Sequence, residues 1–253
     1  MSPALLHTVD LDVGHGARAL VRHIALELRP GALTALIGVN GSGKSTLLRT
    51  LAGLLPPLRG HVHAGGHDLR TLSAPERARR IALVTPAPAA TGLLDVRTLV
   101  AFGRHPWTGR LGRLAPADHR AVEAAMDMAG IAHLARRPVD RLSDGERQQV
   151  VIARALAQAT PVMLLDEPTA FLDLVNRVRI MRLLRTIATG QGKAMLLSTH
   201  DLRTALDHAH RLLVIDRGHA WAGTPGEALR NGHLARAFER DGLVLDPVTG
   251  ALR

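Results

Sequence analysis

The chain has 253 residues, enough for one large domain or for a domain with a subdomain. It has no cysteine, which excludes a disulfide framework, a cysteine metal site and a cysteine nucleophile. The formal net charge is +10, but the basic residues are scattered and have no interleaved aromatic residues. We therefore expect a solvated, arginine-rich surface and no nucleic-acid partner, with weak attraction to anionic lipid as a second possibility.

The start of the chain, "MSPALLHTVDLDVG", lacks a basic region followed by an apolar run, so we expect no signal peptide. No window approaches 18 uninterrupted apolar residues, so no segment is predicted to cross a membrane by itself. The absence of cysteine is compatible with a reducing cytosolic compartment.

The first part of the chain is predicted to form strands, ending in a short buried run at Leu33–Ile37. A glycine-rich loop follows, and then a helix that ends near Gly53. The segment "GHVHAGGHDL" predicts a strand and a glycine turn, and "RIALVTPAPAATGLL" predicts a strand that enters a loop.

Residues 95–158 have a helical pattern, and three short apolar runs follow them: "PVMLLDEP", "AMLLSTHD" and "RLLVIDRG". Predicted helices at Arg177–Thr189 and Leu202–Ala209 separate these runs. Strands that alternate with helices indicate an α/β fold with a mostly parallel sheet. We interpret the middle block as an α-helical subdomain inserted into that sheet.

The loop "GVNGSGKST" follows a predicted buried strand and opens a helix, as a phosphate-binding loop requires. Its glycines let backbone N–H groups surround phosphate oxygens. Lys44 can neutralise phosphate charge, and the Ser45 hydroxyl can bind Mg²⁺. A glycine-rich turn with a chance lysine is a poor alternative to this full match, so we predict that the chain binds a nucleoside triphosphate.

Two other predicted strands end in polar residues on the side where a parallel sheet binds ligands. Asp166 would hold Mg²⁺ through its water shell, Glu167 would polarise the attacking water, and His200 would bond to the γ-phosphate. Two histidine pairs have spacings that could suggest a metal, namely His61 with His63 and His208 with His210. Neither pair has an evident third ligand, so we expect no metal at either.

The stretch "RLSDGERQQV" predicts a helix start, with Ser143 as N-cap and Glu146 completing a capping box. Such an end has free N–H donors and a partial positive charge, so it can hold an anion. The chain thus has two predicted phosphate-binding helix starts, about a hundred residues apart.

The motifs "GVNGSGKST", "LSDGERQQ", "MLLDEPTAFLD" and "STHD" resemble, in order and spacing, those of the ATP-binding subunits of ABC transporters. The resemblance covers roughly residues 11–225. It implies a phosphate-loop ATPase core with a mostly parallel sheet, an N-terminal antiparallel β part and an inserted helical subdomain. It also implies a head-to-tail homodimer, in which the phosphate loop of one subunit and the signature helix of the other enclose each ATP.

The family's functional residues transfer to the matching positions here. The expected ATP-binding residues are His15, Gly38, Asn40, Gly41, Ser42, Gly43, Lys44, Ser45 and Thr46. The signature residues expected to act in trans are Ser143, Asp144, Gly145 and Glu146, of which Asp144 and Glu146 depart from the usual LSGGQ. Asp173 would link the two sites, Glu167 and His200 would be catalytic, and Ser45 and Asp166 would bind Mg²⁺.

The segment "GRHPWTGRLGRL" resembles the subfamily that imports ferric siderophores, haem and vitamin B12. This implies a polytopic permease partner, docked near residues 93–107, a substrate-binding protein and a peripheral place on the cytoplasmic face of the inner membrane. We expect an ATP-binding domain at 1–225, with a helical subdomain at about 88–158, and a C-terminal extension at 226–253. Pro86 stands where the family carries a glutamine, which predicts altered coupling to the permease.

Two alternatives compete with a transport motor. One is a soluble ABC ATPase that acts on ribosomes or DNA, but such proteins usually have tandem ATP domains or a long coiled-coil insertion, whereas this chain has one phosphate loop. The other is a regulatory module without turnover, against which Glu167 and His200 argue.

Overall fold

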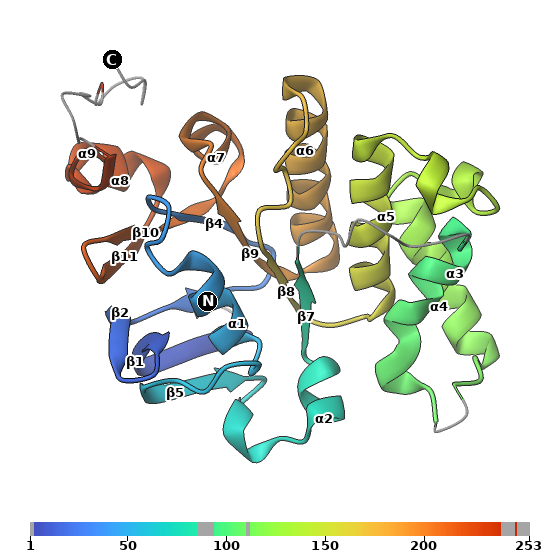
Figure 1. Cartoon of the computed structure of the whole chain (residues 1–253), viewed down its shortest axis with the longest axis horizontal. Helices are drawn as coiled ribbons and strands as arrows, with labels where there is room; N and C mark the ends of the chain where they lie inside the picture. Colours follow the sequence, from blue (N-terminus) through green and yellow to red (C-terminus); the bar gives the residue numbers. More distant parts are fainter. Residues whose placement is uncertain (1–2, 86–93, 110–111, 239–245, 247–253) are drawn as a thin grey trace.

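The computed structural model describes residues 3–85, 94–109, 112–238 and 246. Their strands join one mixed sheet in the order β6-β5-β1-β2-β11-β10-β4-β9-β8-β7, with β3 paired to β1. Figure 1 shows the sheet with helices packed on it and a group of helices at one side. The strands are β1 Leu6–His15, β2 Arg18–Ile24, β3 Glu27–Leu28, β4 Leu33–Ile37, β5 Arg59–Ala64, β6 His67–Asp68, β7 Ile81–Val84, β8 Val162–Leu165, β9 Ala194–Thr199, β10 Arg211–Asp216 and β11 His219–Gly223.

Among the described residues, the helices alternate with the strands of the parallel half. They are α1 Lys44–Leu51, α2 Ala74–Ala78, α3 Val96–Ala101, α4 Pro116–Met128, α5 Asp144–Ala157, α6 Leu174–Gln191, α7 Leu202–His208, α8 Pro225–Arg230 and α9 His233–Phe238. Short 3₁₀ helices join them, including η1 Leu69–Thr71 and η2 Phe102–Trp107. The predicted α/β fold is confirmed.

Strand β4 lies in the middle of the parallel half, between β9 and β10. All five of its residues are buried, because hydrophobic side chains are needed on both faces of a sheet covered by helices. Leu33, Ala35 and Ile37 belong to one hydrophobic cluster, and Leu36 belongs to the cluster on the other face. Strand β4 therefore begins and ends where the sequence predicted a short buried run, at Leu33 and Ile37.

The N-terminal part is antiparallel, as predicted: β1 pairs with β2 on one side and with β5 on the other. Strand β5 then turns through Gly65 and Gly66, both at positive φ, into β6. This part packs with α1 in the second hydrophobic cluster.

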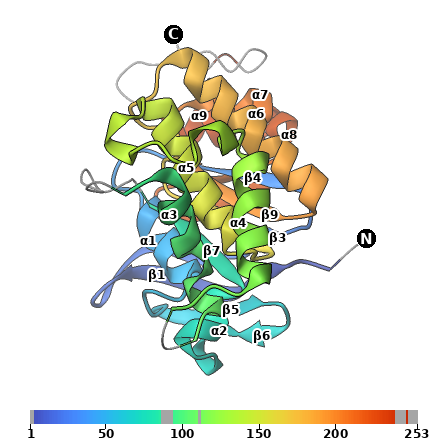
Figure 2. The same ribbon diagram turned by 90° about the vertical axis from the view of Figure 1, so that its right-hand side faces the viewer.

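Helices α3, α4 and α5 lie side by side at the edge of the molecule, where Figure 2 brings them toward the viewer. Their buried apolar residues belong to the same hydrophobic cluster as Leu33, Ala35 and Ile37 of β4. None of the helices in the described ranges combines the length and the apolar character needed to traverse a bilayer.

The expected C-terminal extension starts with helices α8 and α9, which the sequence pattern did not predict. Helix α8 starts with a capping box between Thr224 and Glu227, and α9 follows directly. Ala228, Leu234 and Ala237 are buried in the hydrophobic cluster. The start of the expected extension at 226–253 is therefore packed against the core.

Candidate functional site

The phosphate loop joins the end of β4 to the start of α1. Gly41 and Gly43 have φ values of 77° and 99°, a region that disfavours side chains. At Gly38, a Cβ would lie 2.7 Å from Ser42 Oγ and 3.0 Å from the Ile215 carbonyl oxygen. Glycine is thus required here by backbone conformation and by close packing.

The side chain of Lys44 folds back over this loop. Its Nζ donates to the carbonyl oxygens of Gly38, at 2.8 Å, and Val39, at 3.1 Å. Burial lowers the pKa of Lys44, and the nearby carboxylates of Glu167 and Asp166 counteract only part of this effect. A buried ammonium group therefore lies beside the loop that is suited to phosphate.

Strand register brings the polar ends of three strands together. In the parallel pair β4–β9, Ile37 lies opposite Thr199, and in the pair β8–β9, Leu165 lies opposite Leu197. The residues that follow β4 and β8 therefore meet the end of β9 at one edge of the sheet. The three motifs that were predicted separately share this edge.

A serine that the sequence reasoning missed organises the two carboxylates. Ser198 Oγ donates to Asp166 Oδ1 at 2.7 Å and accepts from the N–H of Glu167 at 2.8 Å. Asp166 and Ser198 are buried, whereas the side chain of Glu167 is 33% exposed. The only signal for Ser198 in the sequence is a hydroxyl within an otherwise apolar run.

Glu167 has a φ of 46°, a left-handed conformation that is uncommon for a residue with a side chain. His200 Nδ1 lies 4.0 Å from Glu167 Oε2, and the His200 side chain is mostly exposed. The predicted catalytic pair therefore lies together, with Glu167 held through its backbone by Ser198.

His15, at the end of β1, reaches the same loop from the antiparallel part. Its Nε2 lies 3.0 Å from Thr46 Oγ1 on α1. Ser42 Oγ is a buried polar atom that lacks a hydrogen-bond partner in the part of the chain that the structure describes. A loop with an unpartnered hydroxyl, a buried ammonium group and an exposed imidazole fits a nucleotide with its phosphates.

The oxygen groups expected to bind Mg²⁺ fit a hard cation. Ser45 lies exposed in the first turn of α1, beside Lys44, and Asp166 presents a buried carboxylate near that lysine. Mg²⁺ prefers such oxygen ligands and keeps several waters.

The predicted capping box at the start of α5 is confirmed. Ser143 N–H donates to Glu146 Oε2 at 2.8 Å, and Glu146 N–H donates to Ser143 Oγ at 3.3 Å. The hydroxyl of Ser143 also donates to Glu146, at 2.9 Å. Asp144 projects outward and forms an exposed ion pair with Arg147 at 3.4 Å, which partly offsets its charge.

Gly145 is buried against α6. A Cβ there would lie 2.8 Å from Asn176 Oδ1, and Asn176 Nδ2 in turn donates to Asp173 Oδ2 at 2.9 Å. Packing within the chain is thus sufficient to explain the glycine at this signature position. The sequence reasoning missed Asn176, which links two of its predicted motifs.

In Figure 1, α5 belongs to the helical group and lies beyond β7 and β8 from α1. The two helix starts that were predicted to bind phosphate are therefore carried by different parts of the molecule. Asp173, which was predicted to link the sites, is the N-cap of α6 and accepts from the N–H of Asn176 at 2.8 Å.

Three large, exposed apolar side chains lie within two residues of Asp173 in the sequence. Phe171, Leu174 and Val175 have relative accessibilities of 93%, 68% and 77%. Scattered exposed apolar residues are normal, but a group of three within five residues is typical of a contact surface.

The segment "GRHPW" makes up most of η2, and its residues connect helices α4 and α5. Arg104 is buried: its Nε donates to Asp118 Oδ1 at 2.8 Å and its Nη1 to the carbonyl of Ala157 at 2.7 Å. A Cβ on Gly103 would lie 2.1 Å from the Arg154 carbonyl oxygen. This motif thus fixes η2 to α4 and to the end of α5.

We expect Arg104→Ala to lower the free energy of unfolding by about 3 kcal/mol, because it leaves the buried Asp118 carboxylate without its cation. Arg97→Ala is a matched control, since it also removes an arginine paired with a carboxylate of α4, here the partly exposed Glu123. That change should cost about 1 kcal/mol or less. Denaturant unfolding of both variants measures the difference, and equal losses would contradict a structural role for Arg104.

Pro86, for which altered coupling to the permease was predicted, lies outside the described residues.

The two histidine pairs, at which no metal was expected, have different outcomes. His210 Nδ1 accepts from the Leu33 N–H at 3.0 Å, and the pair His208 and His210 joins no group of three ligands among the described residues. For His61 and His63, the expectation that a third ligand is missing is wrong, because the β5–β6 turn brings Asp68 beside them.

The profile of the ABC transporter family matches residues 21–170. The chain is 39% identical over 249 residues to a cobalamin import ATP-binding protein of Halobacterium salinarum, a match that spans 98% of this chain but 62% of that protein. It is 37% identical over 246 residues to the iron(3+)-hydroxamate import ATP-binding protein of Bacillus subtilis, covering 96% and 91% of the two chains. The solved structure of cbiO1 from Clostridium perfringens, part of the ABC transporter complex cbiONQ, matches with a TM-score of 0.79 at 27% identity, covering 92% and 96%.

Proposed function

Because the chain belongs to the ABC transporter family, we propose that it is the ATP-hydrolysing subunit of an importer that takes up an iron chelate or vitamin B12 through a partner permease. The observation that carries the proposal is the meeting of the phosphate loop, Asp166, Glu167 and His200 at one edge of the parallel sheet. The relatives named for cobalamin and iron(3+)-hydroxamate import support the substrate class.

In this proposal, the loop N–H groups and Lys44 hold the phosphates of ATP, and His15 stacks on the adenine. Mg²⁺, held by Ser45 and Asp166, would supply charge neutralisation of the phosphates. Glu167 orients and polarises the attacking water, and His200 donates to the γ-phosphate. The hydrogen bonds of Ser198 suit separate roles for the two acids. They fix the side chain of Asp166, but they hold Glu167 only through its backbone N–H and leave its carboxylate available to water.

The signature residues Ser143 and Gly145 would complete the site of a second copy of the chain. This is supported by the position of α5 on a different part of the molecule from α1. It is also supported by the exposed apolar group of Phe171, Leu174 and Val175 beside Asp173. A head-to-tail dimer would cover that group and bring two helix starts to each ATP.

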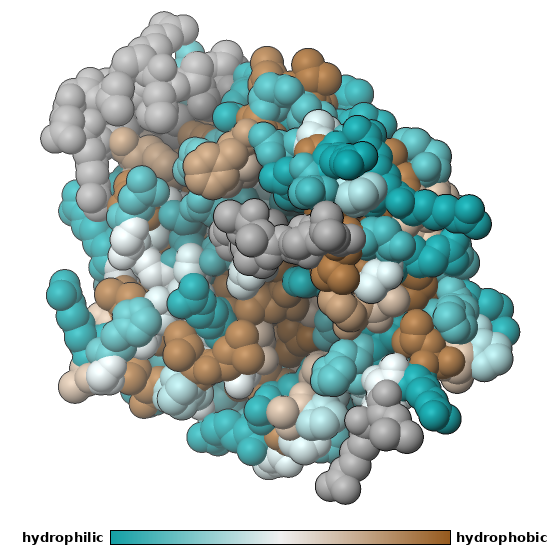
Figure 3. Space-filling model, turned by 45° about the vertical axis from the view of Figure 1, so that its right-hand side comes forward, coloured by the Kyte–Doolittle hydropathy of each residue, from teal (hydrophilic) through white to brown (hydrophobic). Residues whose placement is uncertain are grey.

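The permease would dock on the helical part, and we place the protein at the cytoplasmic face of the membrane for that reason. A groove of about 460 Å³ lies beside η2 and α4, and its lining includes Phe102, His105, Leu114 and Val122. Figure 3, in which the side of the helical part comes forward, shows apolar side chains among polar ones on a hollowed face. Phe102 is 55% exposed, so an apolar coupling helix of the permease could cover it.

Reconstitution with a partner permease and its substrate-binding protein tests the proposal. Binding protein loaded with its substrate should stimulate ATP hydrolysis. Phe102→Glu should abolish this stimulation and leave basal hydrolysis unchanged, because it adds a charge to the proposed docking groove and not to the nucleotide site. Leu54→Glu is the matched control, since Leu54 is also an exposed apolar residue but follows α1. Stimulation by ribosomes or DNA instead of the loaded binding protein would overturn the importer assignment.

A further inference from the structure

The antiparallel part carries a group of potential metal ligands, His61, His63 and Asp68, that belongs to none of the motifs described above. His61 and His63 are two residues apart on β5, so their side chains share one face of the sheet. Asp68 on β6 lies directly opposite His63. One ligand atom from each of the three side chains lies within 4.8 Å of the other two.

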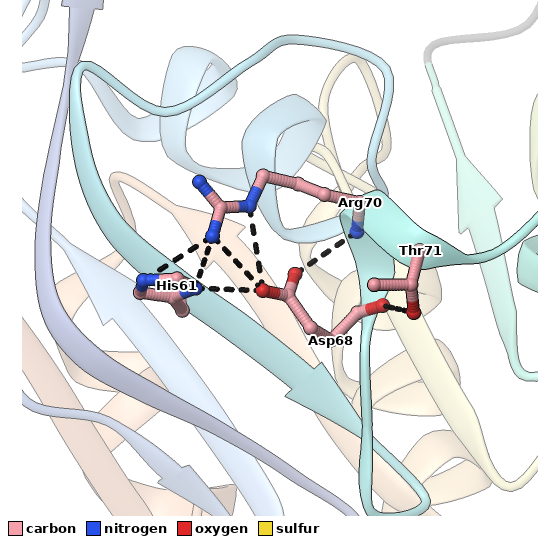
Figure 4. Close-up of polar contacts among 4 residues, drawn as sticks. All are labelled: His61, Asp68, Arg70 and Thr71. Carbon is pink, nitrogen blue, oxygen red and sulfur yellow. Dashed lines mark hydrogen bonds and ion pairs between the residues drawn. The ribbon is translucent and has the colours of Figure 1, made fainter.

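The chain after β6 orients the carboxylate of Asp68, as Figure 4 shows. Asp68 Oδ1 accepts from the N–H of Arg70 at 3.0 Å, and the Thr71 hydroxyl donates to the Asp68 carbonyl at 2.8 Å. These bonds leave Asp68 Oδ2 directed at His61 Nδ1, at 2.6 Å. The hydrogen bonds with His61 and with the N–H of Arg70 therefore fix the carboxylate in place.

His7, on β1, supports the group without joining it. It lies opposite His63, and the two rings stack with centroids 4.9 Å apart and planes 4° apart. The lone pairs of the ring nitrogens lie in two parallel planes, so the two rings cannot both direct a nitrogen at one ion in this arrangement. His7 instead packs on the face of His63 and limits its motion.

A cation already contacts the group in this structure. The guanidinium of Arg70 lies 3.0 Å from Asp68 Oδ2 and contacts both ring nitrogens of His61, with Nε2 at 3.2 Å. The Arg70 side chain is 53% exposed, so it can turn into solvent, whereas that of Asp68 is only 16% exposed. Arg70 therefore competes for the position that an ion would take.

We propose that His61, His63 and Asp68 bind a divalent first-row transition metal of the Zn²⁺ type, and that Arg70 leaves the group when the metal binds. Two imidazole nitrogens and one carboxylate oxygen suit such ions, whereas Mg²⁺ and Ca²⁺ prefer oxygen ligands. Three protein ligands would leave a coordination position for water or for an external ligand. The site would tie β5 to the β6 segment, on a part of the molecule separate from the nucleotide loop.

Titration of the full-length, untagged, nucleotide-free protein with ZnCl₂, followed by calorimetry, tests this site. Wild type should show a saturable site, and His61→Ala/His63→Ala and Asp68→Asn should each weaken it on the order of tenfold or more. Arg70→Ala should strengthen it, because the competing cation is removed. Asp68→Asn keeps a side-chain acceptor for the Arg70 N–H, so it remains informative if the double variant folds poorly.

His67→Ala is the matched control. His67 is exposed in the same turn, but it lies opposite Ala64 and therefore on the other face of the ribbon. It should bind Zn²⁺ as wild type does. Zn²⁺ should also raise the melting temperature of wild type and His67→Ala but not of the double variant, and Mg²⁺ should raise none of them through this site. Equal Zn²⁺ affinity in wild type, the double variant and Asp68→Asn, or no saturable binding in wild type, would overturn the proposal.

Discussion

Glu167→Gln is expected to slow ATP hydrolysis by about 10²–10⁴-fold while ATP still binds. The change removes the negative charge that would polarise water in the proposed mechanism, but it keeps the size of the side chain. The N–H of residue 167 can still donate to Ser198, so the position of the carboxylate of Asp166 should be preserved. Phosphate release measures turnover, and a fluorescent ATP analogue measures affinity.

The same variant should accumulate as an ATP-bound dimer, because in the proposed dimer the nucleotide that joins the two subunits would no longer be consumed. Light scattering on a sizing column, with and without ATP, measures this state. Glu123→Gln is the control: Glu123 is a partly exposed glutamate of α4 whose ion pair with Arg97 lies away from the site. Turnover of Glu167→Gln close to that of Glu123→Gln would refute the role of Glu167.

Local patterns predicted the parts of the site that depend on neighbours in sequence. The run Leu33–Ile37, the glycine loop and the helix after it follow from burial, backbone freedom and helix initiation within residues 33–51. The capping box at Ser143 follows from a spacing of three residues. The meeting of Asp166, Glu167 and His200 followed from the general rule that parallel strands present their carboxyl ends at one edge.

Contacts set by tertiary register could not be predicted in this way. Ser198 acts on Asp166 because β8 and β9 pair in a particular register, and 32 residues separate the two. Gly145 meets Asn176 only because α5 packs beside the start of α6. Asp68 joins His61 because the glycine turn reverses the chain, which a count of histidine spacings does not reveal.

Ser143→Ala is expected to reduce hydrolysis by roughly 10²-fold, the effect of removing one hydrogen-bond donor from a transition-state oxygen. Its effect on the affinity of the monomer for ATP should be small, because α5 and the phosphate loop of one chain lie on different parts of the molecule. The change also removes a helix cap, at a cost of about 1 kcal/mol. Thr224→Ala controls for that loss, since Thr224 forms the same capping box with Glu227 at the start of α8.

Mixing two impaired variants separates action in trans from action within one chain. In a mixed head-to-tail dimer of Glu167→Gln with Ser143→Ala, one site contains both changes, and the other has an intact Glu167 from one subunit and an intact Ser143 from its partner. Equal mixing before ATP is added should restore about a quarter of wild-type hydrolysis, because about half of randomly paired dimers are mixed and each holds one intact site of two. If Ser143 instead served the nucleotide of its own chain, every site in the mixture would carry one defect. The mixture would then hydrolyse ATP no faster than the average of the two variants, and the composite site would be excluded.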